Sequence, residues 1–455
     1  MVLDLFGTLK NVSEEQWSTK FRILKDDQYG ERDIVLQWTE GLVDRDHNMI
    51  EKFQKTFHSS FWEFYLYACF KEAGFDVDQT HNRPDFMITK PFEMNVEAVV
   101  ANIKQGGRPE SDRGASDLMD MFVPPRNQKD FFALQHEAIT RQSNALQSKI
   151  KKYSEYSKCG WVKKDVPYVI ALSSYGQVNY GREYIYPMMT LLYGMYYLPE
   201  EDDYRLVEDI PKPDSNARIP VGLFRTNEYS EISAVLYSCT TTLGKVTSLS
   251  ISKGNQSPNV VFNLRRDYGD PRRPYKIHEV NFNSPEMLTD GLFLFHNPFA
   301  KNKLDIKNFE NTNITQYFFK ANKFVHTANT FPIVCRLNIP KLIRGEYVNL
   351  IDEYYRQYNR VPPLEYYSLE LQEKVEIDFE KNCLVCIWFS VTPEGLHMRN
   401  IHYERPQSLS DNFLRREVYA EMVKIRQKSD KYYIGAVRRI DIIRTEEQYN
   451  IVNQV

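Results

Sequence analysis

Residues 61–70 read FWEFYLYACF, and Glu63 is the only charged residue among them. The run belongs to a segment, 57–73, whose spacing predicts a helix that is apolar nearly all round and ends at Gly74. A helix of this kind is buried. An ionised carboxylate in such a place costs several kcal/mol unless something positive meets it. We therefore expect Glu63 to have a partner, a metal ion or a raised pKa.

Two further acids lie in predicted strands downstream of this helix. The run PDFMI at 84–88 places Asp85 at the opening of an apolar strand, and the run NVEAVV at 95–100 places Glu97 in the middle of another. Charges are rarely buried in an apolar strand without a partner. Carboxylates from two adjacent strands, with a third from a packed helix, make a plausible site for a hard cation such as Mg²⁺.

A long helix predicted over 130–156 supplies positive charge. Lys149 lies on its apolar stripe, where a polar side chain needs a partner, so it is placed to reach a buried carboxylate. Arg141, Lys151 and Lys152 form a local basic patch around it. In a chain whose net charge is only −3, this patch is where we expect contacts with phosphates.

These acids, in the order helix, three strands, helix and strand, resemble the PD-(D/E)XK nuclease superfamily. The resemblance covers residues 57–175, about a quarter of the chain. It implies an αβββαβ restriction-endonuclease-like core with helices on both faces of the sheet. By the resemblance, Asp85 and Glu97 would hold Mg²⁺, or alternatively Mn²⁺, and Glu63 would be an additional acid.

The chain departs from the superfamily pattern at one position. The lysine expected two residues after the second acid is Val99 here. In some members the following helix supplies the lysine, so Lys149 is carried over to the role, with Lys152 as a substitute.

The implied activity is metal-dependent hydrolysis of phosphodiester bonds in nucleic acid, with DNA favoured over RNA. Two other interpretations stay open. One is a catalytically inactive protein of this fold that binds nucleic acid or another protein. The other is a structural network of buried ion pairs formed by Glu63, Asp85, Glu97 and Lys149.

The length of 455 residues predicts several domains, and the balanced charge excludes a polycationic nucleic-acid coat. We expect an α+β or α/β multi-domain chain, in which a β-rich region and an α+β domain come after the core. The expected parts are an N-terminal segment at 1–56, a nuclease-like core at 57–200, a β-rich accessory domain at 215–325 and a C-terminal domain at 326–455. The proline-rich and charged stretch 199–220 is the predicted linker.

Six scattered cysteines, no long apolar run and no signal-peptide pattern predict a cytoplasmic protein outside the membrane. Weaker signals are interpreted mainly as structural. They are the Asp4-Leu5-Phe6-Gly7-Thr8-Leu9 run, the Cys383/Cys386 pair, His278, His296, Gly244-Lys245, and a predicted loop formed by residues 265–268 and 271–276, whose sharper alternative is a nucleic-acid contact.

Overall fold

The computed structural model describes residues 3–454 except 105, 109–111, 114, 178–179, 271–272, 321–322, 360–375, 391–397, 416, 419–421 and 423–436. The chain divides into two compact units. The first comprises Met1–Asp267 with Lys276–Ile351, and the second comprises Tyr268–Tyr275 with Asp352–Val455.

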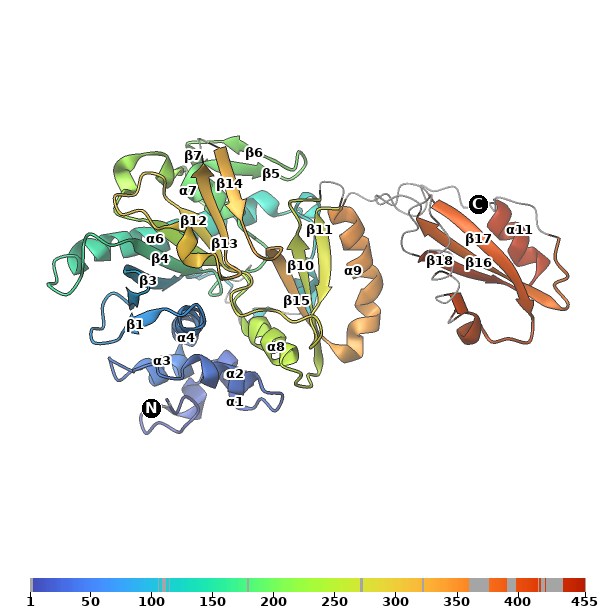
Figure 1. The fold of residues 1–455 in the computed structure, drawn as a ribbon, viewed down its shortest axis with the longest axis horizontal. Helices are drawn as coiled ribbons and strands as arrows, with labels where there is room; N and C mark the ends of the chain where they lie inside the picture. Colours follow the sequence, from blue (N-terminus) through green and yellow to red (C-terminus); the bar gives the residue numbers. More distant parts are fainter. Residues whose placement is uncertain are drawn as a thin grey trace. The chain divides into compact units, whose positions relative to one another are not determined.

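The first unit is built on one mixed sheet of eight strands in the order β1-β2-β3-β4-β9-β12-β13-β14 (Figure 1). Strand β3 runs parallel to β4, and β4 runs parallel to β9, whereas β2 is antiparallel to both of its neighbours. The two middle strands, β4 and β9, are nearly continuous apolar runs, as expected where both faces of a sheet are covered. The strands are β1 (Asp76–Asp78), β2 (Phe86–Lys90), β3 (Met94–Val100), β4 (Tyr168–Ser173), β9 (Ala234–Ser238), β12 (Phe293–His296), β13 (Thr315–Lys320) and β14 (Lys323–Thr327).

Helices α4 (His58–Glu72) and α6 (Phe131–Tyr156) pack on opposite faces of this sheet. Val96 and Ala98 of β3 belong to the apolar core that α4 shares. Glu97, which lies between them, points to the other face and meets α6. From α4 through β1, β2, β3 and α6 to β4, the chain follows the predicted order of helix, three strands, helix and strand, with the short α5 (Ala115–Asp120) added. The mixed α and β class is therefore confirmed.

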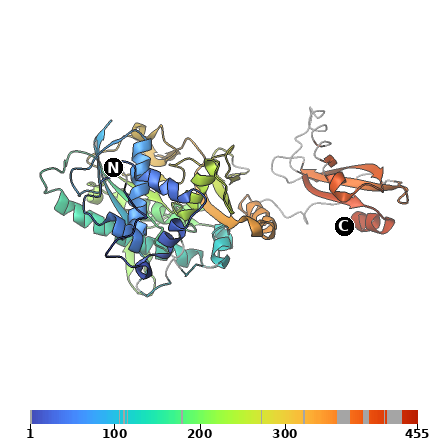
Figure 2. The same ribbon diagram turned by 90° about the horizontal axis from the view of Figure 1, so that it is seen from below.

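The N-terminal residues are part of this unit and do not stand apart from it. Helices α1 (Thr19–Lys25), α2 (Glu31–Trp38) and α3 (Met49–Lys55) lie beside α4, as the blue ribbons of Figures 1 and 2 show. Their aromatic side chains join the core of α4: the ring centroids of Trp38 and Tyr65 lie 5.2 Å apart, as do those of Phe53 and Phe64. The separate segment expected at 1–56 is therefore a layer of the same core.

The boundary expected between a core at 57–200 and an accessory domain at 215–325 is wrong. Strand β9 is hydrogen-bonded directly to β4, with Ile170 opposite Val235, so both belong to one sheet. Within the predicted linker the chain forms small hairpins and then returns to the sheet. Helix α7 (Tyr186–Tyr193) and strand β5 (Met195–Leu198) come just before the linker, and β6 (Asp203–Leu206), β7 (Asp209–Pro211) and β8 (Arg218–Pro220) lie within it.

The predicted boundary at 325–326 is also wrong, as a smaller sheet in the order β11-β10-β15 shows. Strand β15 (Ile333–Pro340) pairs with β10 (Asn259–Arg266), which places it in the first unit, although the C-terminal domain was expected to start at 326. The unit also contains α8 (Leu243–Ser252). Strand β11 (Tyr275–Glu279) and helix α9 (Arg344–Tyr358) cross the division between the units.

The second unit contains the sheet β17-β16-β18 and helix α11 (Glu446–Gln454), which fits the α+β expectation. The strands are β16 (Asn382–Ser390), β17 (Met398–Pro406) and β18 (Val437–Ile443). Cys383 and Cys386 point to opposite faces of β16 and belong to two different apolar clusters, so they do not form a site together.

Candidate functional site

Asp85 and Glu97 face each other across the β2–β3 pair. The register that places Phe86 opposite Val96 brings Asp85, just before β2, next to Glu97 in β3. The backbone N–H of Ala98 donates to Asp85 Oδ2 at 2.7 Å, and the backbone N–H of Asp85 donates to Glu97 Oε2 at 3.4 Å. These two bonds fix both carboxylates on the backbone of an antiparallel ladder.

Lys149 of α6 reaches both acids. Its Nζ donates to Glu97 Oε1 at 2.7 Å and lies 3.7 Å from Asp85 Oδ2. Burial alone would lower the pKa of Lys149, but the charges of Asp85 and Glu97 outweigh it and raise that pKa. Burial and the nearby charge of Asp85 raise the pKa of Glu97, against the effect of Lys149. The lysine is therefore a firmly protonated counter-charge that two carboxylates share.

Glu63 joins the cluster from α4. Burial, followed by the negative charge of Asp85, raises the pKa of Glu63 to about 8, while Lys149, Lys52 and Arg45 oppose that rise. Of the three outcomes expected for a carboxylate in this helix, the structure gives the raised pKa. Glu63 thus holds a proton near neutral pH and can exchange it there.

A cavity of about 90 Å³ opens beside Glu63 and Asp85. A cavity of this size holds a few water molecules or an ion with part of its hydration shell. The rest of its lining comes mainly from the segment before α3 and from α3 itself, and is polar. These residues are Asp44, Arg45, Asp46, Asn48, Met49, Lys52, Ser60 and Asn82.

Arg45 is the central residue that the sequence analysis missed. Its guanidinium donates to the backbone oxygens of His81 and, at 2.8 Å, Asp85, so it fixes the segment that carries Asp85. Asn82 of the same segment donates to Asp46 at 2.9 Å. The only sequence signal is the polar run DRDHN at 44–48 ahead of a helix, which does not reveal a partner about 36–40 residues away.

The carboxylates of Asp85, Glu97 and Glu63 are the groups that could hold a metal ion here. They are hard oxygen ligands of the kind that Mg²⁺ and Mn²⁺ prefer, and two of them, Glu63 and Asp85, line the polar cavity. Among the residues that the structure describes, however, no group of three acidic, histidine or cysteine side chains is arranged as a preformed metal site. Lys149 supplies the counter-charge of Glu97 in this structure, and a cation bound there would share or replace that role.

The three residues predicted to contact nucleic acid all lie on α6. Arg141 is paired with Glu137, with Nε 2.7 Å from Oε1, and its side chain is largely covered. Lys151 and Lys152 are exposed on the last turns of the helix. Because Lys149 itself reaches both acids, Lys152 is not needed as its substitute.

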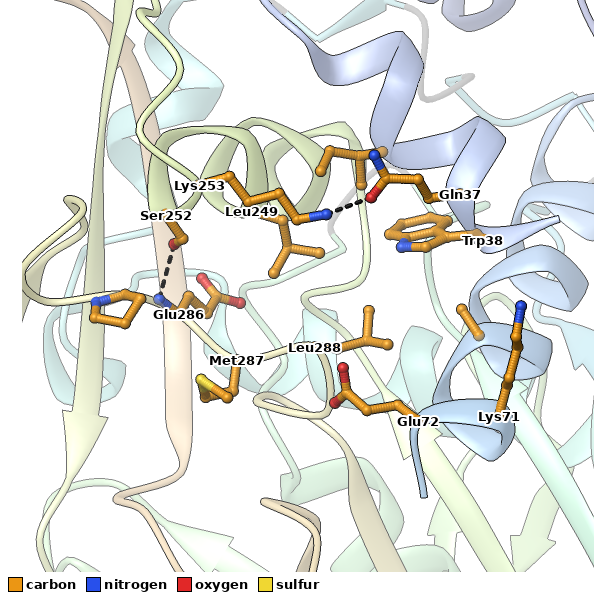
Figure 3. Close-up of a pocket in the computed structure, with 13 residues that line it drawn as sticks. Gln37, Trp38, Lys71, Glu72, Leu249, Ser252, Lys253, Glu286, Met287 and Leu288 are labelled. Atoms are coloured by element: carbon orange, nitrogen blue, oxygen red, sulfur yellow. Dashed lines mark hydrogen bonds between the residues drawn. The ribbon is translucent and has the colours of Figure 1, made fainter. Parts of the chain in front are cut away.

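A second cavity, of about 560 Å³, lies between α2, α4 and α8 and is separate from the carboxylates. Figure 3 shows Trp38, Leu249 and Leu288 around it, with Lys253 bonded to Gln37 at its rim. Its lining is mostly apolar, and it contains none of the predicted site residues.

The weaker sequence signals are structural where the structure describes them. His278 accepts from Arg265 Nε at 3.0 Å, and His296 Nε2 lies 3.0 Å from Gln316 Oε1. Arg265 is buried in β10 and paired with Asp290 at 2.7 Å, and the strand continues through Arg266, so the predicted loop begins only at Asp267. Its charge is used inside the protein, which leaves Arg265 unavailable to nucleic acid.

No family model, curated protein or solved structure matches this chain. Within the described residues, none of the helices has the length and apolar character needed to cross a membrane.

Proposed function

We propose that this protein is a metal-dependent nuclease-like hydrolase of phosphodiester bonds. The observation that carries the proposal is a deficit of positive charge. Glu63 and Asp85 line a polar cavity, Asp85 lies against Glu97, and Lys149 is the only cation that bonds to these carboxylates among the described residues. The pKa values of Glu63 and Glu97 are raised, as expected for buried carboxylates with too little positive charge around them. Perturbed carboxylates in a cleft are typical of catalytic sites.

Each side chain has a role that its position supports. Asp85 and Glu97 would hold Mg²⁺ or Mn²⁺, which supplies a Lewis acid that lowers the pKa of a bound water. Lys149, held protonated by these acids, would stabilise the negative charge that develops on the phosphate. Glu63, with a pKa of about 8, can accept or donate a proton near neutral pH. Val99, where the motif lysine is missing, is on the same face of β3 as Glu97, the face that Lys149 approaches from α6.

A second function is favoured by one contact. The 2.7 Å bond between Lys149 and Glu97 is a closed ion pair, as in a fold that has kept the residues but lost the chemistry. In that case the protein binds nucleic acid, DNA rather than RNA, without cleaving it. The binding would use the exposed cations of α6.

Cleavage assays with the full chain separate the two functions. Plasmid DNA, linear duplex, single-stranded DNA and RNA would each be incubated with MgCl₂, with MnCl₂ and with EDTA. We expect metal-dependent cleavage that falls on the order of 100-fold or more in Asp85→Asn and Glu97→Gln. Glu93→Gln is the matched control, because Glu93 lies just before the same strand but is exposed and pairs with Lys163.

Metal binding gives a readout that does not depend on activity. Titration with Mn²⁺, followed by the paramagnetic resonance of the free ion, should show a site in the wild type and in Glu93→Gln but not in Asp85→Asn. Cleavage that survives EDTA or both site variants would contradict the nuclease proposal. Binding of DNA without any cleavage would favour the second function.

A further inference from the structure

Trp161 is an unusual tryptophan for this chain. It lies beyond the end of α6 and is 45% exposed, whereas Trp38, Trp62 and Trp388 are buried. Large exposed aromatic surfaces often mark places where a partner binds. Trp161 takes no part in the carboxylate cluster itself.

The exposed indole is held in a fixed orientation. Its Nε1–H donates to the backbone oxygen of Arg83 at 3.0 Å. Its ring stacks on the imidazole of His81, with centroids 4.6 Å apart and planes inclined by 12°. A flat aromatic pair that is already ordered loses little conformational entropy when a ligand stacks on it.

The pair is attached to the segment that carries Asp85. Residues 81–85 include His81, Arg83 and Asp85, and Arg45 bonds to this segment at both of its ends. The Arg83 guanidinium also lies 5.5 Å from the ring centre of Tyr156, the last residue of α6. The stacking pair and the carboxylates therefore belong to one rigid neighbourhood.

Several exposed cations lie close in the sequence to the two residues of the pair. Arg83, Lys152, Lys158 and Lys164 are exposed, and none of them forms an ion pair within the described part of the chain. The acids of the same stretch are Glu155 and Asp165, so the cations are in excess. Aromatic faces among unpaired cations are the elements with which proteins bind single strands of nucleic acid.

We propose that Trp161 and His81 form a stacking platform for an unpaired base of a single-stranded nucleic acid, whose backbone is bound by the surrounding cations. This inference rests on the proposed function, because it gives the carboxylate site a substrate with unpaired bases. The bases of an intact duplex are already stacked on each other, so the platform favours a single strand or a frayed end over blunt duplex.

The test is binding of the full chain to a dye-labelled single-stranded oligonucleotide in EDTA, followed by fluorescence anisotropy. We expect Trp161→Ala to weaken binding roughly 5- to 100-fold, the range for loss of one base–aromatic stack. Trp161→Phe keeps a stacking face but cannot bond to Arg83, so it should retain most of the affinity. A blunt duplex of the same sequence should bind more weakly than the single strand.

Phe132→Ala is the matched control. Phe132 is also 45% exposed and also stacks on an aromatic ring, that of Tyr196, with the planes at 12°. Phe132 lies at the start of α6, about 36 Å along the helix from Tyr156 at its end, where Arg83 and Trp161 are found. The control should bind as the wild type does.

The outcomes distinguish this inference from the nuclease proposal. If Trp161→Ala loses affinity while neither the wild type nor Glu93→Gln cleaves with Mg²⁺, the platform stands and the nuclease fails. If the wild type cleaves but Trp161→Ala binds the single strand within about twofold of the wild-type affinity, the change is smaller than the loss of one base–aromatic stack. That result would overturn the stacking platform and leave the nuclease proposal in place. Absence of single-strand binding by the wild type, or tighter binding of blunt duplex, also overturns the platform.

Discussion

Two buried glutamate–lysine pairs in the first unit have nearly the same length but opposite electrostatic character. The Glu97–Lys149 pair measures 2.7 Å and the Glu286–Lys245 pair 2.6 Å. Burial alone would raise the pKa of either glutamate. At Glu286 the charges of Arg336 and Lys245 hold the pKa well below its usual range, whereas at Glu97 the pKa remains raised.

The difference lies in how completely each pair is satisfied. Lys245 uses its three donors on Glu286, on the Met287 oxygen at 2.7 Å and on the Asp290 oxygen at 2.9 Å. The carboxylate of Glu286 also accepts hydrogen bonds from the Arg336 guanidinium and, at 2.8 Å, from the Asn263 amide. Lys149, in contrast, is shared between two carboxylates with Glu63 nearby.

This comparison separates structure from function. A satisfied network such as that of Glu286 stabilises the fold, although Glu286 lines the second cavity. A cluster with surplus negative charge beside a cavity has a cost in stability that a bound cation would relieve. Charge balance, rather than the presence of a buried ion pair, is therefore the property that marks the carboxylate cluster as the candidate site.

The largest effect that tests this comparison is expected from Glu286→Gln. Removing one partner of a fully buried pair leaves its cations uncompensated and costs about 3–5 kcal/mol in the free energy of unfolding. Glu97→Gln should cost only about 1–2 kcal/mol, because Lys149 keeps Asp85 and is partly exposed. Urea unfolding of both variants measures the two losses. Equal losses would contradict the distinction and favour a structural role for both pairs.

An intermediate effect is expected from Glu63→Gln as the pH changes. Folded Glu63 keeps its proton up to about pH 8, whereas the unfolded chain loses it near 4.5. Between these values the folded state binds the extra proton, so its stability falls as the pH rises, by at most roughly 1.4 kcal/mol per pH unit. The variant should lack this contribution in urea unfolding between about pH 5 and pH 8.

For Glu63→Gln, the slope of the free energy of unfolding against pH has to be compared with the slope of the wild type. Burial also raises the pKa of Glu183, to about 7, so a second buried acid titrates in the same range and contributes to both proteins. Identical slopes in the two proteins would show that Glu63 is ionised in the folded chain.

The smallest effect is expected from Lys152→Ala, which removes an exposed cation three residues from Lys149. Its free energy of unfolding should change by no more than about 0.5 kcal/mol. Its affinity for nucleic acid should fall modestly, with the slope of log affinity against log salt reduced by about one. Binding isotherms at several salt concentrations measure this. A large loss of stability would place Lys152 in the structural network instead.

Much of the candidate site could be predicted because its signal is local. An acid alone in an apolar helix or strand conflicts with its neighbours, and so does a lysine on an apolar stripe. That conflict identified Glu63, Asp85, Glu97 and Lys149, which the structure brings together. In β3, Glu97 lies on the face opposite Val96 and Ala98, because successive side chains of a strand point to opposite faces.

The rest of the site depends on contacts between distant parts of the chain. Arg45 and Lys52 come from the N-terminal residues, which were expected to form a separate segment. Exposed arginine and lysine are common on helices and loops, so neither residue conflicts with its local surroundings. Only the packing of α3 on α4 brings them to Glu63.

The domain boundaries failed for a related reason. Prolines and charges at 199–220 do interrupt the regular pattern, and the chain does form small hairpins there. Beyond residue 220 the chain returns to the same sheet through the pairing of β4 with β9. Two parallel strands joined by a long connection leave no local pattern in the sequence. The composition therefore predicted a linker between domains, whereas the chain forms hairpins there and then rejoins the same sheet.

The sequence by itself determined which residues could not be ordinary core or surface, because the cost of burying charge is a property of local composition. It also determined the order of helices and strands around them. The tertiary structure alone decided that Asp85 and Glu97 share one lysine, that Arg45 and Lys52 complete the surroundings of Glu63, and that Trp161 stacks on His81. Those outcomes depend on distances between residues far apart in the chain, and it is distance that sets the strength of charge and stacking interactions.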